Sequence, residues 1–401
     1  MNESLLSWEN ARQIISSLPA LIKTDSIDIE DACGLVCAED MCARYASPPF
    51  DNSAVDGFVV FSGFEQFKHV SIVESVFAGS KPVFSEFNQD QAVRIMTGAP
   101  VPAGAERVVM QEDCTCEGNR LVIHQPGKAG QHMRRQGEDF FSGEKICRAG
   151  TIFTPAHIGL LASAGISQVN VNVAPSVGVL LTGDETVDPK EQLNPGQIFN
   201  SNLPAIKSAL KQMGISIIET VLVEDCEAAT TRALTKLASA HNIVITVGGL
   251  SVGARDYVLS SLNAINANLL FSRVGIKPGK PLTMAQCQDT LICCLPGNPV
   301  SALITMFLFL RPFIGRCCAF SQPESWVTAK SFSTITKKVG RTEFVPGTVL
   351  KSEFHPLTVR GSHLLGSLAA CTHLAIFPAE KSDVSIGDPL DIVQFSWGFA
   401  R

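Results

Sequence analysis

The sequence predicts a multidomain α/β protein with a three-layer α/β/α domain, a β-rich inserted domain and a small C-terminal β-barrel-like domain. Strand-like and helix-like segments alternate regularly between residues 174 and 317, which is typical of βαβ units in a mainly parallel sheet. Short β segments separated by Gly, Pro and Asn occupy residues 58–140 and return after residue 317. At 401 residues, the chain also exceeds the length that one hydrophobic core usually supports.

Composition limits the possible partners. Charged residues make up 17% of the chain and the formal net charge is −6, which argues against a general nucleic-acid-binding surface and requires any anion site to be local. The N-terminus lacks a basic region followed by an apolar core, so we expect no secretion signal. The most apolar run, residues 302–310, is too short to span a bilayer. We therefore expect a cytoplasmic protein that does not enter a membrane.

The thirteen cysteines do not form a recognisable framework. Their number is odd, no C-x-x-C motif occurs, and the pairs Cys293-Cys294 and Cys317-Cys318 lie in apolar runs. We expect buried, reduced thiols, not disulfides or a metal site.

Local signals place the elements outside the sheet domain. Ser7 is a predicted N-cap for an amphipathic helix that ends at Leu18, and Thr154 precedes a helix that starts at Pro155 and stops before Gly165. The β-rich segments are expected at residues 59–61, 70–77, 92–96, 108–111 and 121–124, and those of the last domain at 332–339, 348–354, 374–377 and 389–395.

Hydrophobic periodicity orders the α/β region. Strands are predicted at residues 177–181, 215–223, 243–247, 269–274, 282–285 and 291–295. Helices are predicted at 201–213, 228–240 and 300–310, the last with Asn298 as N-cap and Pro299 as its first residue.

The stretch from residue 243 to 257 is the most informative part of this region. A run of β-branched residues stops at Gly248-Gly249, and a loop of small residues then leads to Asp256. Because carboxyl ends of parallel strands face the ligand crevice and glycines let a phosphate-like group approach the backbone, Asp256 is a candidate ligand-binding residue. The alternative is a tight connection with a surface Asp.

Three further strand ends point to the same edge of the sheet. Glu185 and Asp225 follow predicted strands, and the helix that starts at Asn298-Pro299 follows another. Acids around an anion site imply an intervening cation, and oxygen-only ligands suit Mg²⁺. Lys277 and Lys280 could add positive charge, although a K-P-G-K segment is more often an exposed turn.

Two motifs in the β-rich region have a structural and a functional interpretation. D-N-S-A-V-D-G (residues 51–57) could present acids to a ligand or form a turn capped by Asp side chains. H-M-R-R-Q-G-E-D (residues 132–139) could offer anion donors beside an acid or form a solvated charge cluster.

Taken together, the motifs resemble the molybdopterin molybdenumtransferases, called MoeA in bacteria and present as the E domain of gephyrin in animals. The resemblance covers nearly the whole chain. It rests on D-N-S-A-V-D-G, R-I-M-T-G-A-P-V-P, R-R-Q-G-E-D, T-G-D-E, G-G-L-S-V-G-A-R-D-Y, K-P-G-K-P, L-P-G-N-P-V-S-A, G-R-T-E-F and G-S-H, in that order. The sheet domain alone is similar to MogA-type and CinA-type proteins, so the first three and last two motifs discriminate.

The resemblance implies an enzyme that joins molybdate to the dithiolene of adenylylated molybdopterin and releases AMP with the help of Mg²⁺. It implies five active-site acids: Asp56, Asp139, Glu185, Asp225 and Asp256, with Glu185 and Asp256 at the Mg²⁺. The expected substrate-binding residues are Gly248, Gly249, Ser251, Gly253, Lys277, Lys280, Pro296, Gly297, Asn298, Pro299, Arg341 and Ser362.

The resemblance also implies an assembly and a domain plan. We expect a homodimer whose site combines Asp56 and Asp139 of one subunit with Asp256 of the other. A MogA-like adenylyltransferase is expected to supply the adenylylated molybdopterin. The implied domains are a discontinuous linker and dimerisation domain (1–45 and 140–173), the β-rich domain (46–139), the MogA-like domain (174–317) and the last domain (318–401). A gephyrin-like scaffold and a non-catalytic pterin-binding paralogue are the alternatives.

Overall fold

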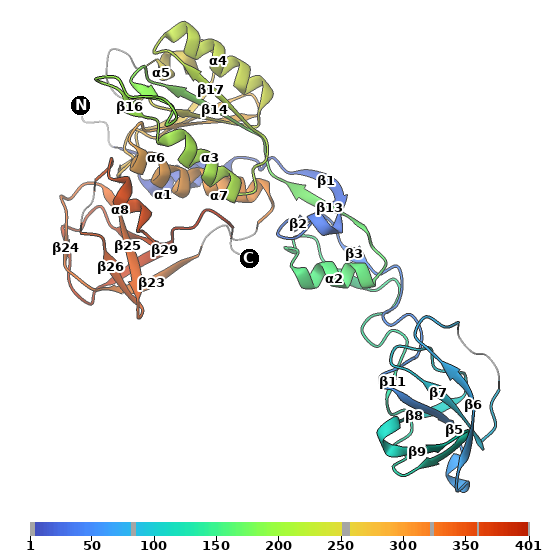
Figure 1. Cartoon of the computed structure of the whole chain (residues 1–401). Coiled ribbons are helices and arrows are strands. Elements are labelled where there is room, and N and C mark those ends of the chain that lie inside the picture. Colours follow the sequence, from blue (N-terminus) through green and yellow to red (C-terminus); the bar gives the residue numbers. More distant parts are fainter. Residues whose placement is uncertain (1–4, 82–85, 251–256, 321–324, 359–360, 400–401) are drawn as a thin grey trace. The chain divides into compact units, whose positions relative to one another are not determined.

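The computed structural model describes residues 5–81, 86–250, 257–320, 325–358 and 361–399. The chain forms two compact units (Figure 1). The inserted unit is Ser26–Val171, and the sheet–barrel unit combines Met1–Asp25 with Asn172–Arg401. Each unit has its own sheets and its own hydrophobic cores.

The inserted unit is built on a six-stranded sheet with the order β8-β5-β7-β6-β10-β9. Its strands are β5 (Gly57–Phe61), β6 (Val70–Val76), β7 (Gln91–Ile95), β8 (Ala105–Met110), β9 (Cys114–Glu117) and β10 (Arg120–Ile123). The five predicted β segments of this region are confirmed. The sequence missed β9, because this edge strand is mostly exposed and has no apolar pattern.

Short elements complete the inserted unit. The strands β1 (Lys23–Asp28), β13 (Gln168–Val173) and β2 (Val36–Cys37) form one sheet, and β3 (Met41–Cys42) pairs with β12 (Lys145–Cys147). β4 (Asn52–Ser53) pairs with β11 (Met133–Arg134). The helix α2 (Pro155–Ser163) begins as predicted, because Thr154 accepts a hydrogen bond from the backbone N–H of His157.

The sheet of the sheet–barrel unit has the order β17-β14-β18-β22-β21-β19. The first four strands run parallel to one another, and β21 alone runs against them, because it pairs antiparallel with both β22 and β19, so the prediction of a mainly parallel sheet is confirmed. The strands are β14 (Val177–Thr182), β17 (Ile218–Val223), β18 (Ile243–Val247), β19 (Asn268–Ser272), β21 (Thr283–Cys287) and β22 (Thr290–Leu295).

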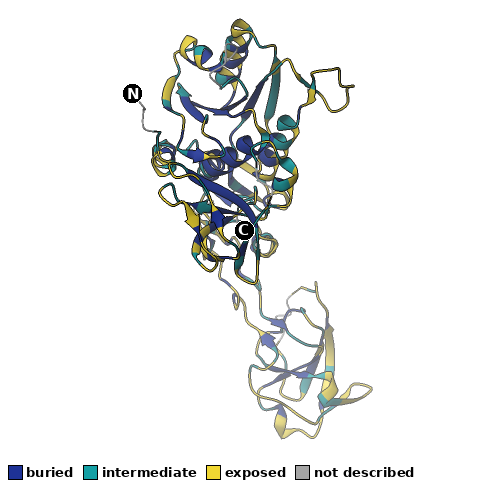
Figure 2. Cartoon of the chain, turned by 90° about the vertical axis from the view of Figure 1, so that its left-hand side faces the viewer, coloured by how far each residue is buried: buried dark blue, intermediate teal, exposed yellow. Residues whose placement is uncertain are grey.

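Helices cover both faces of this sheet, which makes the predicted three layers. Ile243, Ile245 and Val247 point into a core shared with α1 (Trp8–Ser17), α3 (Asn202–Gln212) and α6 (Pro299–Thr305). Val244, between them, packs into a second core with α4 (Glu227–Ala240) and α5 (Val258–Ala264). Both faces of the sheet are therefore buried (Figure 2).

The helix that starts at Pro299 runs further than predicted. After α6 it continues through a π-helical segment, Met306–Leu310, into α7 (Arg311–Cys317), so the predicted end at residue 310 is wrong. Arg311 and Pro312 resemble a helix end in the sequence. In the structure, the Arg311 guanidinium donates to the backbone oxygens of Trp397 and Gly398, which lets a buried helix tolerate this charge.

The same helix is apolar enough to be compared with a membrane span. Among the described residues, Pro299–Cys317 is the single helix long and apolar enough to cross a bilayer. However, 83% of its most apolar window is buried inside the protein. It is the core helix of the unit.

The cysteines are free thiols, as predicted, but not all of them are buried. Cys293, Cys294, Cys317 and Cys318 lie in the core, and burial raises the pKa of Cys294 to about 12. By contrast, four cysteines are exposed, so the expectation of burial is wrong for them: Cys33, Cys42, Cys116 and Cys226. They lie in loops or short edge strands, where no apolar run draws them inside.

The C-terminal part forms a closed five-stranded barrel with the order β25-β26-β23-β29-β27, because β25 also pairs with β27. The strands are β23 (Trp326–Ser331), β25 (Thr342–Leu350), β26 (Glu353–Pro356), β27 (His373–Phe377) and β29 (Pro389–Gln394), with a short side pair of β24 (Ile335–Thr336) and β28 (Asp383–Val384). The small helix α8 (Leu365–Ala369) precedes β27. The strand β20 (Ile276–Lys277) adds to the edge of β25.

Two predicted strands of the barrel are wrong. Residues 332–339 contain only the short β24, and residues 348–354 span the turn between β25 and β26. Lys351 and Ser352 form that turn with φ values of 48° and 67°. Neither is Gly, Asn or Asp, the residues that usually announce a left-handed conformation, so no turn signal marks this position in the sequence.

Phe307 offers a test of the core. Its side chain is fully buried, and its ring lies 4.8 Å from the Phe395 ring and 5.7 Å from the Trp397 ring, between centroids. We expect Phe307→Ala to lower the free energy of unfolding by roughly 3–5 kcal/mol through lost burial and a cavity. Chemical denaturation checks this. Val327→Ala, at an exposed position of β23, is the control, and an equal loss in both variants would contradict the packing.

Candidate functional site

The carboxyl ends of four parallel strands meet at one edge of the sheet, as predicted. The backbone N–H of Asp225 donates to Asp184 at 3.1 Å, which joins the loops after β17 and β14. The side-chain amide of Asn202 donates to the backbone oxygen of Gly297 at 2.8 Å and fixes the loop after β22. The structure thus brings the loops of Glu185, Asp225 and Asn298 to a common edge.

The glycines of this edge are required by close packing. Gly248 and Gly249 have φ values of 91° and 65°, which favour glycine. A Cβ at Gly249 would lie 2.8 Å from a methyl group of Val258, and one at Gly248 would lie 3.2 Å from the Thr182 oxygens. The predicted residues Ser251, Gly253 and Asp256 lie outside the described residues.

The carboxylate of Glu185 is exposed at this edge and turns back over its own loop. A Cβ at Gly183 would lie 2.9 Å from Glu185 Oε2, so the absence of a side chain at Gly183 makes room for this carboxylate. Asp184, which was not among the predicted site residues, uses its side chain to hold the Asp225 loop.

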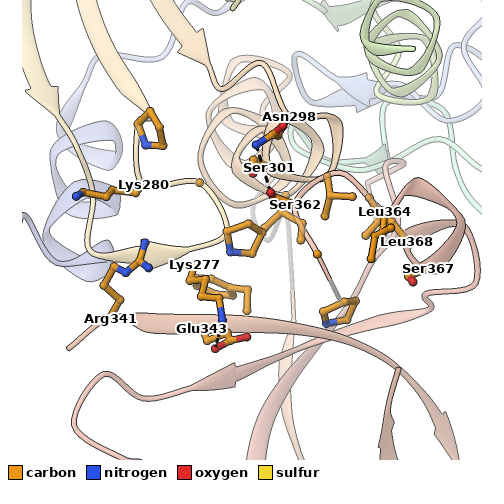
Figure 3. A pocket seen from close by; sticks show the side chains of 18 residues that line it. Lys277, Lys280, Asn298, Ser301, Arg341, Glu343, Ser362, Leu364, Ser367 and Leu368 are labelled. Carbon is orange, nitrogen blue, oxygen red and sulfur yellow. Dashed lines mark hydrogen bonds and ion pairs between the residues drawn. The ribbon is translucent and has the colours of Figure 1, made fainter. Parts of the chain in front are cut away.

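A cavity of about 310 Å³ opens beside Asn298, between the K-P-G-K-P turn, the start of α6 and the barrel (Figure 3). It collects five predicted site residues from distant segments: Lys277, Lys280, Asn298, Arg341 and Ser362. Three other polar lining residues were not predicted as site residues. Ser301 and Glu343 lie within the L-P-G-N-P-V-S-A and G-R-T-E-F motifs but were assigned no role, and Ser367 lies in none of the motifs.

Hydrogen bonds fix the polar side chains of this cavity. The Arg341 guanidinium donates to the backbone oxygen of Ile276 at 3.3 Å. Asn298 occupies the N-cap position of α6, but its side chain makes no capping bond and donates to Ser362 Oγ at 3.2 Å instead. The backbone N–H of Val300 donates to the Ser362 backbone oxygen at 3.1 Å, so the G-S-H loop lies over the start of α6.

The cavity is positively charged overall. Among the described lining residues, the three cations Lys277, Lys280 and Arg341 and the single carboxylate of Glu343 give a net formal charge of +2. Lys277 Nζ lies 3.3 Å from Glu343 Oε2. Behind this pair, Lys337 donates to the backbone oxygens of Arg341 and Ala379, and burial lowers the pKa of Lys337 while the charge of Glu343 opposes that shift.

The inserted unit carries a second group of predicted residues. Thr97 donates from both its backbone N–H and its hydroxyl to Asp56 Oδ1, each at 2.8 Å. The pKa of Asp56 is held below its usual range although the side chain is exposed. The backbone hydrogen bond from Thr97 has the larger effect, and the hydroxyl hydrogen bond adds to it. The D-N-S-A-V-D-G and R-I-M-T-G-A-P-V-P motifs therefore meet at this acid.

Asp51 links the third motif to the first. Arg135 donates to Asp51 Oδ2 at 2.6 Å, and the backbone N–H of Gln136 donates to Asp51 Oδ1 at 2.8 Å. Burial alone would raise the pKa of Asp51, but these two donors outweigh it and lower the pKa. Asp139 is exposed, and its backbone N–H donates to the Ser47 oxygen at 2.9 Å.

A magnesium ion would find hard oxygen ligands at the sheet edge. Within the described ranges, no three His, Cys, Asp or Glu side chains form a ready-made metal cage. Mg²⁺ is usually held by one or two carboxylates together with substrate phosphates, and the exposed carboxylate of Glu185 fits that habit. The edge therefore suits a metal that arrives with a phosphate.

Comparisons with known proteins decide the family. The MoeA N-terminal region (domain I and II) matches residues 6–165, and a probable molybdopterin binding domain matches residues 178–316. The molybdopterin molybdenumtransferase of Haemophilus influenzae is 34% identical, over 98% of this chain and 99% of its own length. The chain belongs to the molybdopterin molybdenumtransferase family.

Other relatives agree with this assignment. The molybdopterin molybdenumtransferase of a Nostoc species is 32% identical over 95% of this chain and 91% of its own length. The crystal structure of a molybdopterin biosynthesis MoeA protein from Pyrococcus horikoshii OT3 has a TM-score of 0.78 and 26% identity, and the match covers 98% of this chain and 100% of that one. Family membership makes the chain a transferase with a role in molybdenum cofactor biosynthesis.

The environment of Asp56 gives a testable pKa. Thr97→Val removes the hydroxyl donor but keeps the backbone N–H, so we expect the pKa of Asp56 to rise part of the way to its ordinary value. A depressed carboxyl pKa stabilises the fold above the unfolded value and loses that effect as the pH falls through the folded pKa, so the variant should lose less stability in acid. Carboxyl-detected NMR titration measures the shift. Thr115→Val is the control, and an unchanged Asp56 pKa in Thr97→Val would contradict the hydrogen-bond assignment.

Proposed function

We propose that this transferase inserts molybdate into the dithiolene of adenylylated molybdopterin, with Mg²⁺-dependent release of AMP. The observation that carries the proposal is the cavity that gathers Lys277, Lys280, Arg341 and Ser362 beside the carboxyl edge of the sheet. Molybdate is a tetrahedral dianion, and removing its hydration shell requires several fixed donors. The net formal charge of +2 in the described lining complements that charge.

The sheet edge is the proposed site for the adenylyl phosphate. Gly248, Gly249, Ser251 and Gly253 would let the phosphate approach the backbone. Pro296, Gly297 and Pro299 shape the loop that leads to the start of α6. Glu185 and Asp256 would hold Mg²⁺, with Asp225 beside them. Bound Mg²⁺ would neutralise charge on the phosphate during AMP release.

Asp56 and Asp139 are proposed to act in a homodimer, where the acids of the inserted unit in one subunit serve the sheet edge of the other. The two hydrogen bonds from Thr97 fix the orientation of the exposed Asp56 carboxylate where two motifs meet, which supports a functional role. We further propose a cytoplasmic location, with adenylylated molybdopterin supplied by a MogA-like adenylyltransferase.

Mixed dimers test this assembly. Asp56→Asn and Glu185→Gln each remove one acid in an exposed loop, so we expect both to fold and neither to release AMP. A purified heterodimer of the two variants would contain one intact site, so it should regain about half of the wild-type rate in a twofold-symmetric dimer. A fully active monomer by light scattering, or heterodimers without recovery, would contradict the shared site.

Arg341 tests the anion cavity. Arg341→Ala removes a charged donor, so the molybdate concentration needed for half-maximal insertion should rise by about tenfold or more, while binding of adenylylated molybdopterin changes little. Lys330→Ala removes an exposed positive charge from β23 of the same barrel and is the control. If pterin affinity collapsed while the molybdate requirement stayed the same, Arg341 would belong to the pterin phosphate instead.

A further inference from the structure

Glu343 is the single carboxylate among the described residues that line the cavity, and the fold places it there through strand pairing. In the register of β20 and β25, Lys277 faces Glu343 directly. Residues that lie directly opposite each other on neighbouring strands project their side chains from the same face of the sheet. The Glu343 side chain is only 11% exposed, and Figure 3 shows it beside Lys277.

A carboxylate is a poor choice for a site that only binds an anion. Glu343 repels an oxyanion and reduces the formal charge of the described lining from +3 to +2. Its contact with Lys277, at 3.3 Å, is longer than the roughly 2.7–2.9 Å of a typical charged hydrogen bond. Anion binding alone therefore gives no reason for Glu343, which directs attention to the chemistry of the site.

The proposed reaction, on which this inference rests, has to move protons. When a dithiol and molybdate combine, two Mo–S bonds form and one molybdenum–oxygen bond breaks, which gives a trioxomolybdenum dithiolene dianion and one water. Two S–H bonds break and two O–H bonds form in that water. Molybdenum remains in the +6 state, so no oxidant or reductant is needed. Two protons must therefore travel from sulfur to the departing oxygen.

We propose that Glu343 accepts these thiol protons and passes them to the departing molybdate oxygen. The cationic lining residues Lys277, Lys280 and Arg341 already carry their protons, and the hydroxyls of Ser301 and Ser362 can pass a proton but not hold one. Lys277 orients the carboxylate from β20.

The charged groups around Glu343 fit this role. Lys277 approaches it from β20, Arg341 lies two positions before it in the chain, and Lys337 reaches the same cluster from the segment after β24. From β27, the residue paired with Glu343 is Phe377, which is apolar, so that strand adds no competing proton acceptor at this point.

Glu343→Gln in the full-length protein separates proton transfer from binding. Glutamine can still accept a hydrogen bond from Lys277, and the added net positive charge should leave molybdate binding by calorimetry unchanged or tighter. We expect kcat for insertion at saturating molybdate to fall by about 100-fold or more.

Two controls keep this test decisive. Glu353→Gln changes a carboxylate in β26 that does not line the cavity, and it should behave as the wild type. Glu343→Asp keeps a carboxylate and should retain more activity than Glu343→Gln. If the glutamine variant folds poorly, the activity of Glu343→Asp still tests the role of the carboxylate.

The outcomes distinguish this role from the proposed function. A Glu343→Gln variant with a kcat within about threefold of the wild type would overturn the proton-transfer role alone. Weaker molybdate binding with an intact kcat would also overturn it, and would make Glu343 a positioning residue for Lys277. A wild-type protein that neither binds molybdate nor forms product would overturn the proposed function and this inference with it.

Discussion

The parallel pairing of β20 with β25 is the contact on which the anion cavity depends. It is only two residues long, with Ile276 opposite Thr342 and Lys277 opposite Glu343. Yet it joins the segment between the sheet strands to the barrel. The Arg341 guanidinium strengthens the junction by donating to the Ile276 oxygen, and the Thr342 backbone N–H donates to the Gly275 oxygen. Without this pairing, the cations of the two segments would have no reason to converge.

The sheet supplies the second constraint, which is direction. Because β14, β17, β18 and β22 are parallel, their loops must emerge at one edge, and the buried faces of the sheet fix that edge firmly. The loop after β22 contributes residues both to the sheet edge and to the anion cavity. Gly297 is held at the sheet edge by Asn202, while its neighbour Asn298 reaches Ser362 in the cavity. A phosphate at the edge and an oxyanion in the cavity would therefore be bound by adjacent residues of one loop.

Local chemistry explains which parts of the fold could be predicted from sequence. Ser7 and Thr154 cap their helices as expected, and the uninterrupted apolar run of β18 is a strand buried on both faces. The errors occur where tertiary contacts override local signals. The Arg311 guanidinium is satisfied by backbone oxygens at the far end of the chain, so a helix continues where the sequence predicted its end. The turn at Lys351 and Ser352 has no glycine to mark it.

The candidate site likewise contains residues that sequence motifs predicted and contacts that only the tertiary structure revealed. Lys277, Lys280, Arg341 and Ser362 were predicted from motifs. Glu343 lies in the same G-R-T-E-F motif as Arg341 but was assigned no role, because its partner Lys277 lies 66 positions earlier in the chain. Asp51 was likewise missed as a link, since it contacts Arg135 across 84 positions. Contacts of this kind follow from strand register and not from spacing in the sequence. The motifs could identify participants, whereas the network that orients them required the structure.

If the cavity formed by Lys277, Lys280, Arg341 and Ser362 binds the oxyanion, molybdenum itself can report the position. Anomalous diffraction at the molybdenum absorption edge, from crystals soaked in molybdate, locates the bound metal without assumptions about its ligands. We expect one strong anomalous peak inside this cavity, at a position from which the molybdate oxygens can accept hydrogen bonds from Lys280, Arg341 and Ser362. An ordered molybdate bound elsewhere on the chain, with this cavity free of anomalous density, would contradict the assignment.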